Sequence, residues 1–377
     1  MIFMVGEIKQ ILKPTDFEGL KKALAMGPEK TIEAIKKSGL TGRGGAGFPT
    51  GMKWSFAASA KSKKKYVICN ADEGEPGTFK DKVIIREVPE KIVEGMAICG
   101  LAIGADEGYV YLRYEYSYLI SEFEAAIEAA EAKIKELGFK FKVTLFMGAG
   151  AYVCGDETAI IESIEGKRGQ PRYKPPFPAS VGLFGKPTVI NNVETLANVP
   201  SALVDKEWNN KLRLFSISGT VDKPGVYELP EGITLAEVEK LVEPWGPLKA
   251  VMMGAAGGIA PAKDLVFSQE YLQKQGASLG SCTVVLFDDA VNMVDIAENV
   301  NEFFVHESCG YCTPCREGNR QIRDILSDME DESDIEMMLA LIQNARDTSR
   351  CGLGQTCGCV IEGAIRHFPE DWEDELQ

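Results

Sequence analysis

The sequence lacks a long uncharged hydrophobic run and any excess of basic residues. Every apolar stretch is broken by charge or glycine before it could span a bilayer. The 41 basic against 56 acidic residues give a formal net charge of −15, which argues against a general nucleic-acid-binding protein because such proteins carry a basic face. The first residues show no basic region followed by an apolar core, so we expect no signal peptide and a cytoplasmic location.

The chain is long and apolar enough for several domains, with 377 residues of which 45% are hydrophobic. We expect a helical lead-in over residues 1–39. Strand and helix patterns alternate over residues 40–205, which predicts an α/β domain with a mainly parallel sheet. Residues 206–285 predict a small β-grasp-type domain, and residues 286–377 predict a helical domain that carries most of the cysteines.

Residues 39–54 form a glycine-rich stretch, with six glycines from Gly39 to Gly51. Glycine has no Cβ, so its backbone N–H groups can approach an anion closely. Arg43 offers a guanidinium suited to phosphate, and Lys53 adds a second positive charge. Aromatic rings that could stack on a nucleotide are Phe48, Trp54 and Phe56. The stretch predicts a nucleotide cradle, although it does not follow the Rossmann fingerprint; the alternative is a flexible surface loop.

Polar loops follow two predicted strands, at residues 65–70 and 141–146. The first loop is Asn70–Gly77 and the second is Gly148–Thr158. In α/β folds the ligand-contacting loops lie at such carboxyl ends of strands. We therefore expect both loops at the same site as the glycine-rich stretch.

The last 70 or so residues hold six of the ten cysteines. Cys309, Cys312 and Cys315 form two consecutive C-x2-C steps, and Cys351 supplies a possible fourth ligand. This pitch is typical of a cubane iron–sulfur cluster, whereas structural zinc usually takes two separated cysteine pairs. Zinc or free thiols are the alternatives. Cys357 and Cys359 could be alternative ligands or packed thiols, and the sequence assigns them to neither.

A cluster and a nucleotide cradle together indicate redox chemistry. A cluster transfers one electron at a time, whereas a nicotinamide transfers two as hydride, and a flavin converts between the two. The sequence therefore predicts two nucleotide-like ligands close to each other.

Six motifs resemble the 51 kDa NADH-binding flavoprotein subunit of respiratory complex I and its relatives in NAD-linked hydrogenases, formate dehydrogenases and electron-bifurcating enzymes. They cover nearly the whole chain in the family's order and are GRGGAGFPTG (42–51), NADEGEPGTFKD (70–81), GAGAYVCG (148–155), KPPFPA (174–179), VINNVET (189–195) and ESCGYCTPCREG (307–318). The resemblance implies a Rossmann-like FMN- and NADH-binding domain, then a β-grasp domain, then a C-terminal helical bundle that carries a [4Fe–4S] cluster.

The resemblance also implies the residues at each cofactor. The FMN contacts would be Gly42, Arg43, Gly44, Lys53, Asn70, Asp72, Tyr152, Gly155, Asn191 and Asn192. NADH would be held by Phe48, Phe56, Glu73, Glu75, Lys174 and Phe177, with Asp156 and Glu157 at the same cofactor site. The cluster ligands would be Cys309, Cys312, Cys315 and Cys351. From the residues alone, Glu73 and Glu75 could instead be solvated turn residues.

Two departures from the family's motifs stand out. Asp156 replaces a glutamate and is one methylene shorter, and Cys357 and Cys359 are not expected from the family. The implied activity is hydride transfer between NADH and FMN, in either direction and with no side chain as acid or base. Single electrons then pass to the cluster and to partners, namely a thioredoxin-like [2Fe–2S] subunit and a larger iron–sulfur subunit. The alternatives are an electron-bifurcating subunit of a soluble hydrogenase and a scaffold protein with a structural metal.

Overall fold

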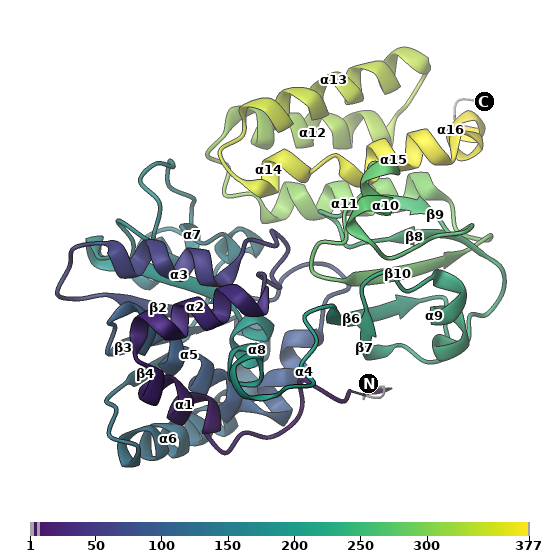
Figure 1. The fold of residues 1–377 in the computed structure, drawn as a ribbon. Coiled ribbons are helices and arrows are strands. Elements are labelled where there is room, and N and C mark those ends of the chain that lie inside the picture. Colours follow the sequence, from purple (N-terminus) through teal and green to yellow (C-terminus); the bar gives the residue numbers. More distant parts are fainter. Residues whose placement is uncertain (1–3, 6–7, 376–377) are drawn as a thin grey trace.

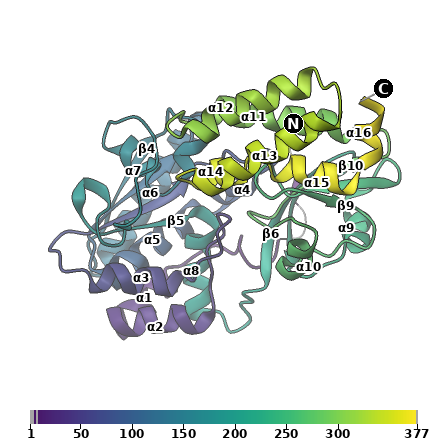
Figure 2. The same ribbon diagram turned by 90° about the horizontal axis from the view of Figure 1, so that it is seen from above.

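The computed structural model describes residues 4–5 and 8–375. It contains two sheets and a layer of helices (Figure 1). A parallel-sheet lobe holds α1 to α8, a mixed-sheet lobe holds β6 to β10, and α11 to α16 form a helical layer beside the mixed sheet. The view from above separates the two lobes and shows α14 at the end of the helical layer nearest the parallel-sheet lobe (Figure 2).

The first sheet is fully parallel and has the order β4-β3-β2-β5. Its strands are β2 (Tyr66–Ala71), β3 (Glu107–Leu112), β4 (Lys142–Met147) and β5 (Thr188–Asn192). This is the 3-2-1-4 order of a doubly wound sheet, in which the topology reverses between the first and fourth strands. The α/β prediction is confirmed, and the reversal point lies between β2 and β5.

Helices cover one face of this sheet and bury its main core. They include α3 (Thr50–Ser59), α5 (Pro89–Ile103), α6 (Ile120–Glu136) and α8 (Val193–Val204). In α5, a Cβ on Gly95 would lie 2.1 Å from the carbonyl oxygen of Leu196 in α8, so this close helix crossing requires glycine. The other face carries only α7 (Ala159–Ile164) and the short helices η2 (Tyr152–Gly155) and η3 (Leu183–Gly185) among the described residues.

The N-terminal segment differs from the expected helical lead-in. The helices α1 (Glu18–Met26) and α2 (Pro28–Ser38) are present, but β1 (Met4–Val5) is a strand that pairs with β7 of the mixed sheet. The Glu228 carboxylate accepts hydrogen bonds from the amides of Lys9 and Ile11 at 2.8 and 3.0 Å. Because an amphipathic pattern cannot reveal such a short edge strand, the sequence missed this link between the lobes.

The second sheet is mixed and has the order β1-β7-β6-β10-β8-β9. Its longer strands are β6 (Leu212–Gly219), β7 (Gly225–Pro230), β8 (Leu248–Met252) and β10 (Thr283–Asp288), with β9 (Ile259–Pro261) at the edge. The helices α9 (Leu235–Val242) and α10 (Gln269–Lys274) pack on one face. The buried central strand β10 runs to Asp288, past the predicted boundary at residue 285, and β1 also belongs to this sheet.

The helical layer packs on the other face of the mixed sheet, and its core includes Met252, Ile259, Phe304 and Ile361. It consists of α11 (Met293–Glu307), α12 (Thr313–Ser327), α13 (Glu332–Thr348), α14 (Gly352–Thr356), α15 (Cys359–His367) and α16 (Pro369–Glu375). None of the helices in the described residues is long and apolar enough to cross a membrane.

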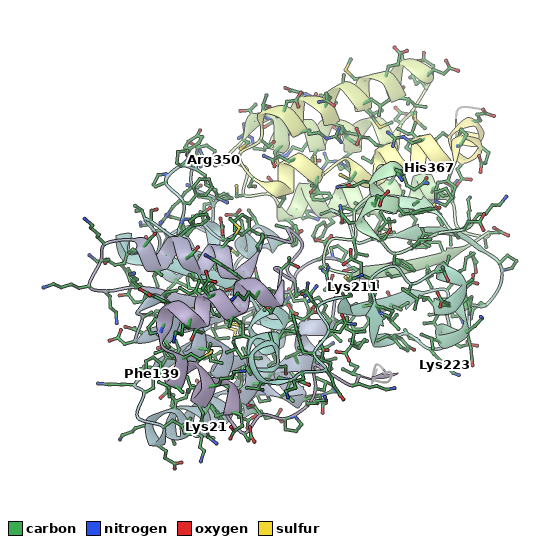
Figure 3. All side chains as sticks on the ribbon, in the orientation of Figure 1. Lys21, Phe139, Lys211, Lys223, Arg350 and His367 are labelled. Carbon is green, nitrogen blue, oxygen red and sulfur yellow. The ribbon has the colours of Figure 1, made fainter. Side chains whose placement is uncertain are left out.

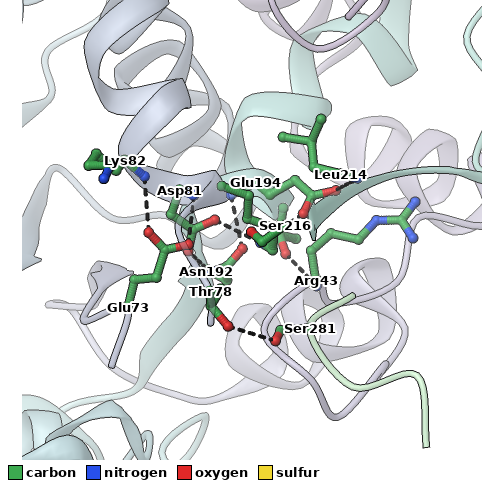
Figure 4. Close-up of polar contacts among 12 residues, drawn as sticks. Arg43, Glu73, Thr78, Asp81, Lys82, Asn192, Glu194, Leu214, Ser216 and Ser281 are labelled. Atoms are coloured by element: carbon green, nitrogen blue, oxygen red, sulfur yellow. Dashed lines mark hydrogen bonds and ion pairs between the residues drawn. The ribbon is translucent and has the colours of Figure 1, made fainter. Parts of the chain in front are cut away.

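A buried charged network joins the two lobes (Figure 4). Lys80, at the start of α4 (Lys80–Glu87), lies 2.8 Å from both Asp81 and Glu194. Glu194 also accepts a hydrogen bond from the amide of Leu214 in β6 at 3.3 Å. Buried charges are tolerated when they are paired, so this network holds β6 against the parallel-sheet lobe.

Candidate functional site

The glycine-rich stretch forms an open loop between α2 and α3. Its neck is closed by hydrogen bonds from the Gly42 amide to the Phe48 carbonyl and from the Thr50 amide to the Leu40 carbonyl, both 2.9 Å. Within the described residues, the exposed amides of residues 44–47 make no hydrogen bond. Gly45 and Gly47 have φ angles of 117° and 62°. Free backbone amides on such a turn are suited to binding an anion.

The loop lies at the reversal point of the parallel sheet. A Cβ on Gly44 would be 3.2 Å from the Cβ of Asn192, at the end of β5. Asn192 pairs in register with Asn70 of β2, and the Asn70 side-chain amide donates to the Gly155 carbonyl at 2.9 Å. Four predicted FMN residues from separate segments therefore converge where a doubly wound sheet binds its ligand.

Asp72 has an unused buried acceptor in the same place. Its Oδ2 atom has no hydrogen-bond partner in the described structure and lies next to Gly155. Burial raises the pKa of Asp72 to about 7, against the opposing charge of Arg113. An unsatisfied buried carboxylate oxygen costs free energy unless a ligand donates to it, so Asp72 fits a bound group with N–H or O–H donors.

Arg43 differs from the expectation for a phosphate ligand. Its side chain is 1% exposed, and Nη2 donates to the Asn210 backbone carbonyl at 2.7 Å. Its amide donates to the Thr195 hydroxyl at 2.9 Å, and Figure 4 shows the guanidinium directed away from Asp81 and Asn192. Burial lowers the pKa of Arg43, although the carboxylate of Glu194 opposes this effect. The guanidinium holds the loop in place through Asn210, and a contact between this side chain and FMN stays a prediction.

Two asparagines at the end of β5 hold neighbouring elements. Asn191 accepts from the indole N–H of Trp54 at 2.9 Å, and this bond buries Trp54 rather than leaving it free to stack on a nucleotide. Asn192 caps α8 by accepting from the Glu194 amide at 2.9 Å, and its side-chain amide donates to Asp81. Both residues thus shape the floor of the site.

Alternating charges line one side of the site. Glu157 lies 3.1 Å from Lys53 and 3.2 Å from Lys174, and Lys174 lies 3.6 Å from Asp156. Burial acts to raise the pKa of Glu157, but Lys53 and Lys174 outweigh it and lower that pKa. Asp156 accepts from the Thr158 and Ala159 amides at 2.8 and 3.2 Å, so the shortened residue caps the start of α7.

The two predicted NADH carboxylates have different surroundings. Glu73 is buried and accepts from the amides of Asp81 and Lys82 at 2.7 and 3.1 Å and from the hydroxyl of Tyr116 at 2.8 Å. These bonds cap α4, so the alternative of a solvated turn is wrong for Glu73, whereas its contact with NADH stays a prediction. Burial raises its pKa.

Glu75 lies instead at the junction of all three parts of the chain. Its carboxylate accepts from the Ala256 amide of the mixed-sheet lobe at 2.8 Å and from the hydroxyl of Tyr152. The Tyr152 amide in turn donates to Glu307, at the end of α11, at 2.5 Å. Burial raises the pKa of Glu75.

Two of the three predicted NADH aromatics form an exposed pair. Phe48 and Phe56 are 44% and 51% exposed, and their ring centroids lie 6.5 Å apart. Phe177 is also exposed, but among the described residues no ring contact joins it to this pair. An exposed aromatic pair beside an anion-binding loop is suited to a nucleotide base.

The cysteines lie at the starts of two helices. Cys312 and Cys351 occupy the N-cap positions of α12 and α14, and Cys315 lies in the first turn of α12. The Ser308 hydroxyl lies 3.3 Å from Sγ of Cys315, and the Arg350 amide donates to Sγ of Cys312 at 3.4 Å. Helix N-termini and N–H···S bonds favour thiolates, which are the form that binds iron. Burial acts in the opposite direction and raises the pKa of Cys315 and of Cys351.

A cavity of about 300 Å³ lies beside these thiols. Cys309, Cys315 and three arginines line it, namely Arg168, Arg316 and Arg320. In the described part of the chain, no three potential metal ligands stand close enough to hold a single metal ion. The donor set, the cavity and its positive lining fit a larger anionic iron–sulfur cluster. Of the six cysteines in this region, Cys309 and Cys315 line the cavity, whereas Cys312, Cys351, Cys357 and Cys359 do not. The buried Cys357 thiol donates to the Gly354 carbonyl at 3.3 Å.

Loops of the nucleotide site contact the cysteine segment directly. Tyr152 bonds Glu307, two residues before Cys309, and Arg168 donates to the Cys309 carbonyl at 2.6 Å. The sequence alone predicts no role for Glu307 or Arg168. Glu307 is the first residue of the cysteine motif, and this position is the signal in the sequence that could have indicated a role for it.

Comparisons with known proteins agree with both halves of the site. Residues 35–201 match the Nuo51 FMN-binding domain, and residues 295–375 match the NADH-ubiquinone oxidoreductase-F iron–sulfur binding region. The chain is 45% identical to the NADH-quinone oxidoreductase F-subunit 2 of Rhizobium meliloti, over 96% of this chain and 92% of that protein. It is 41% identical to the NAD-reducing hydrogenase HoxS alpha subunit of Cupriavidus necator, over 95% of this chain and 62% of that protein.

A solved structure shows the same fold. The crystal structure of an NAD+-reducing [NiFe]-hydrogenase in the H2-reduced state superposes with a TM-score of 0.90 at 38% identity, over 96% of this chain and 64% of the other. The protein is therefore a flavin- and iron–sulfur-binding oxidoreductase subunit. It belongs to the family of NADH dehydrogenase flavoproteins that includes the F-subunits of NADH-quinone oxidoreductases and the alpha subunits of NAD-reducing hydrogenases, which bind FMN and a [4Fe–4S] cluster. The names of these relatives do not favour the bifurcating alternative.

Proposed function

We propose that the chain exchanges hydride with NADH at the glycine loop and passes single electrons out through the cysteine end. The observation that carries this proposal is the convergence of the free amides of residues 44–47 with Asn70, Gly155 and Asn192, beside a loop that contacts the cysteine segment. When bound, FMN supplies the change from two-electron to one-electron transfer.

In this proposal the chain's own residues bind and orient. The amides of residues 44–47 hold the flavin phosphate, and Asn70, Asp72 and Asn192 form the floor of its site. Phe48 and Phe56 offer their rings to the nicotinamide nucleotide. Lys53, Asp156, Glu157 and Lys174 present an edge on which positive and negative charges balance. Gly42, Tyr152, Glu75 and Asn191 support these groups from behind. No side chain is needed as acid or base, because positioning supplies the rate enhancement.

The proposed architecture has a Rossmann-like nucleotide domain over about residues 40–205, a β-grasp domain over about 206–288 and a helical cluster domain beyond it. Cys309, Cys312, Cys315 and Cys351 are the proposed cluster ligands. We further propose a thioredoxin-like [2Fe–2S] subunit and a larger iron–sulfur subunit as partners, because relatives of this chain are named as subunits of complexes.

Anaerobic purification followed by flavin and iron analysis tests the proposal. We expect one FMN and one four-iron cluster per chain, and bleaching of the flavin absorbance on adding NADH. Zinc without flavin, or a flavin that NADH does not reduce, would contradict it. A scaffold role predicts no absorbance change at all.

A further inference from the structure

A stacked arginine links the nucleotide lobe to the cysteine end. The guanidinium carbon of Arg350 lies 3.7 Å from the ring centroid of Tyr173 and 3.6 Å from that of Tyr311. The two rings are 6.4 Å apart and nearly perpendicular. Such distances are well within the range of a cation–π interaction, and arginine stacks on aromatic faces better than lysine does.

The three residues come from three separate segments. Tyr173 lies in the loop after α7, immediately before Lys174, and Tyr311 lies between Cys309 and Cys312. Arg350 immediately precedes Cys351. Figure 3 shows Arg350 where the loops of the parallel-sheet lobe approach the helical layer. The stack therefore joins the loop that carries Lys174 and Phe177 to both cysteine segments.

Further contacts orient Arg350. Its Nη1 donates to the Pro171 carbonyl in the same loop at 2.7 Å, and its backbone amide donates to Sγ of Cys312 at 3.4 Å. The buried Nε and Nη2 atoms have no hydrogen-bond partner in the described structure. Between two rings, the π faces replace ordinary acceptors for these N–H groups. No carboxylate pairs with Arg350 among the described ion pairs, so its charge is not cancelled by an acid.

We propose that Arg350 is a positioning residue that ties the nucleotide loop to the cluster and places an uncancelled positive charge beside the cluster thiols. This inference rests on the proposed function, since it assumes a cluster at Cys312 and Cys351 and a nucleotide near Lys174. The planar guanidinium holds the loop through Tyr173 and Pro171. Its charge favours the reduced cluster, which carries one more negative charge than the oxidised form.

Three variants of the holoprotein separate the stacking role of Arg350 from the role of its positive charge. Arg350→Met removes the charge and the stack together, Arg350→Lys keeps the charge but loses the planar stack, and Tyr173→Leu removes one ring while leaving Arg350 in place. Tyr173 is 68% exposed, so its variant is the least disruptive to folding. The measurements are the iron and flavin content, the cluster reduction potential by spectroscopically monitored titration, and KM for NADH against kcat.

Arg350→Met should shift the cluster's redox equilibrium about tenfold toward the oxidised form, which is about 59 mV for one electron, and should raise KM severalfold. Arg350→Lys should restore the potential but not KM. Tyr173→Leu should raise KM at an unchanged potential. The proposal is overturned if Arg350→Met retains full iron with both quantities unchanged, or if Tyr173→Leu leaves KM unchanged. If Arg350→Met loses its cluster, the potential of Arg350→Lys and the KM of Tyr173→Leu decide whether the proposal holds. A wild-type protein without iron would instead contradict the proposed function itself.

Discussion

The glycine loop and the cysteine segment differ in the groups that they offer to a ligand, which are backbone amides in the loop and side chains in the segment. In the loop, the groups left free for a ligand are backbone amides, and the most suggestive side chain, Arg43, is buried and bonded to Asn210. In the cysteine segment, recognition falls to side chains whose spacing along the chain fixes the donor set, and helix starts hold them. The comparison teaches that a motif can predict where a site lies, while the role of a residue inside it depends on packing.

The largest expected effect is at the cysteine end. Cys312→Ser should abolish cluster binding, because each thiolate is one of only four predicted ligands. Iron analysis and cluster spectroscopy measure the loss. Cys359→Ser is the matched control and should retain the cluster, since Cys359 is not one of the four predicted ligands and its thiol lies beside Arg346 and Glu362. Iron loss in the control would show that the two ends of the cysteine region share the ligation. Flavin content should survive in both variants.

Asp72 predicts a pH dependence at the nucleotide end. Its folded-state pKa of about 7 exceeds its ordinary value, so the folded protein binds this proton more tightly than the unfolded chain does. Stability without FMN should therefore fall as pH rises through the window from about 4 to 7, by about 1–3 kcal/mol. Asp72→Asn should flatten that part of the profile, as measured by urea unfolding at several pH values. An unchanged profile would mean that water already satisfies Oδ2.

A backbone-held site should be sensitive to a single methyl group. Gly47→Ala forces a side chain into a φ of 62°, at a cost of about 1–2 kcal/mol, and flavin affinity should fall about tenfold if the loop relaxes to avoid it. Flavin titration measures this. Gly138→Ala is the control, because Gly138 has a φ of 81° and open space around it at the end of α6. Equal loss of flavin in both variants would refute a local role for the loop.

The smallest expected effect is on the exposed aromatic pair. Phe48→Ala should keep its flavin and raise KM for NADH about threefold to tenfold, which matches the roughly 1 kcal/mol typical of one aromatic contact. Steady-state kinetics with NADH as the varied substrate measure it. Phe184→Ala serves as the control because Phe184 is 51% exposed and packs on Tyr66 instead. Loss of flavin from the Phe48 variant would place the ring at FMN.

The sequence predicted the elements whose signals are local. The strands at Tyr66–Ala71 and Lys142–Met147 and the cysteine spacing follow from periodicity and composition. It did not predict partners that meet only after folding. Arg43 meets Asn210 across 167 positions, and Glu73 caps a helix that begins seven residues later. A guanidinium and a carboxylate look the same in sequence whether they face a ligand or another part of the chain.

The buried network around Lys80 limits how this chain can be divided. Lys80, Asp81 and Glu194 are each less than 5% exposed, and Glu194 needs the β6 amide of Leu214 from the other lobe. The Glu228 carboxylate likewise needs the N-terminal amides that it binds. Severing the chain near residue 205 would leave the Lys80 ion pairs in one piece, but it would take the Leu214 amide from Glu194 and the N-terminal amides from Glu228. The parallel-sheet lobe therefore depends on the mixed-sheet lobe for part of its hydrogen bonding. A chimera that takes the parallel-sheet lobe from this chain must include the mixed sheet as well.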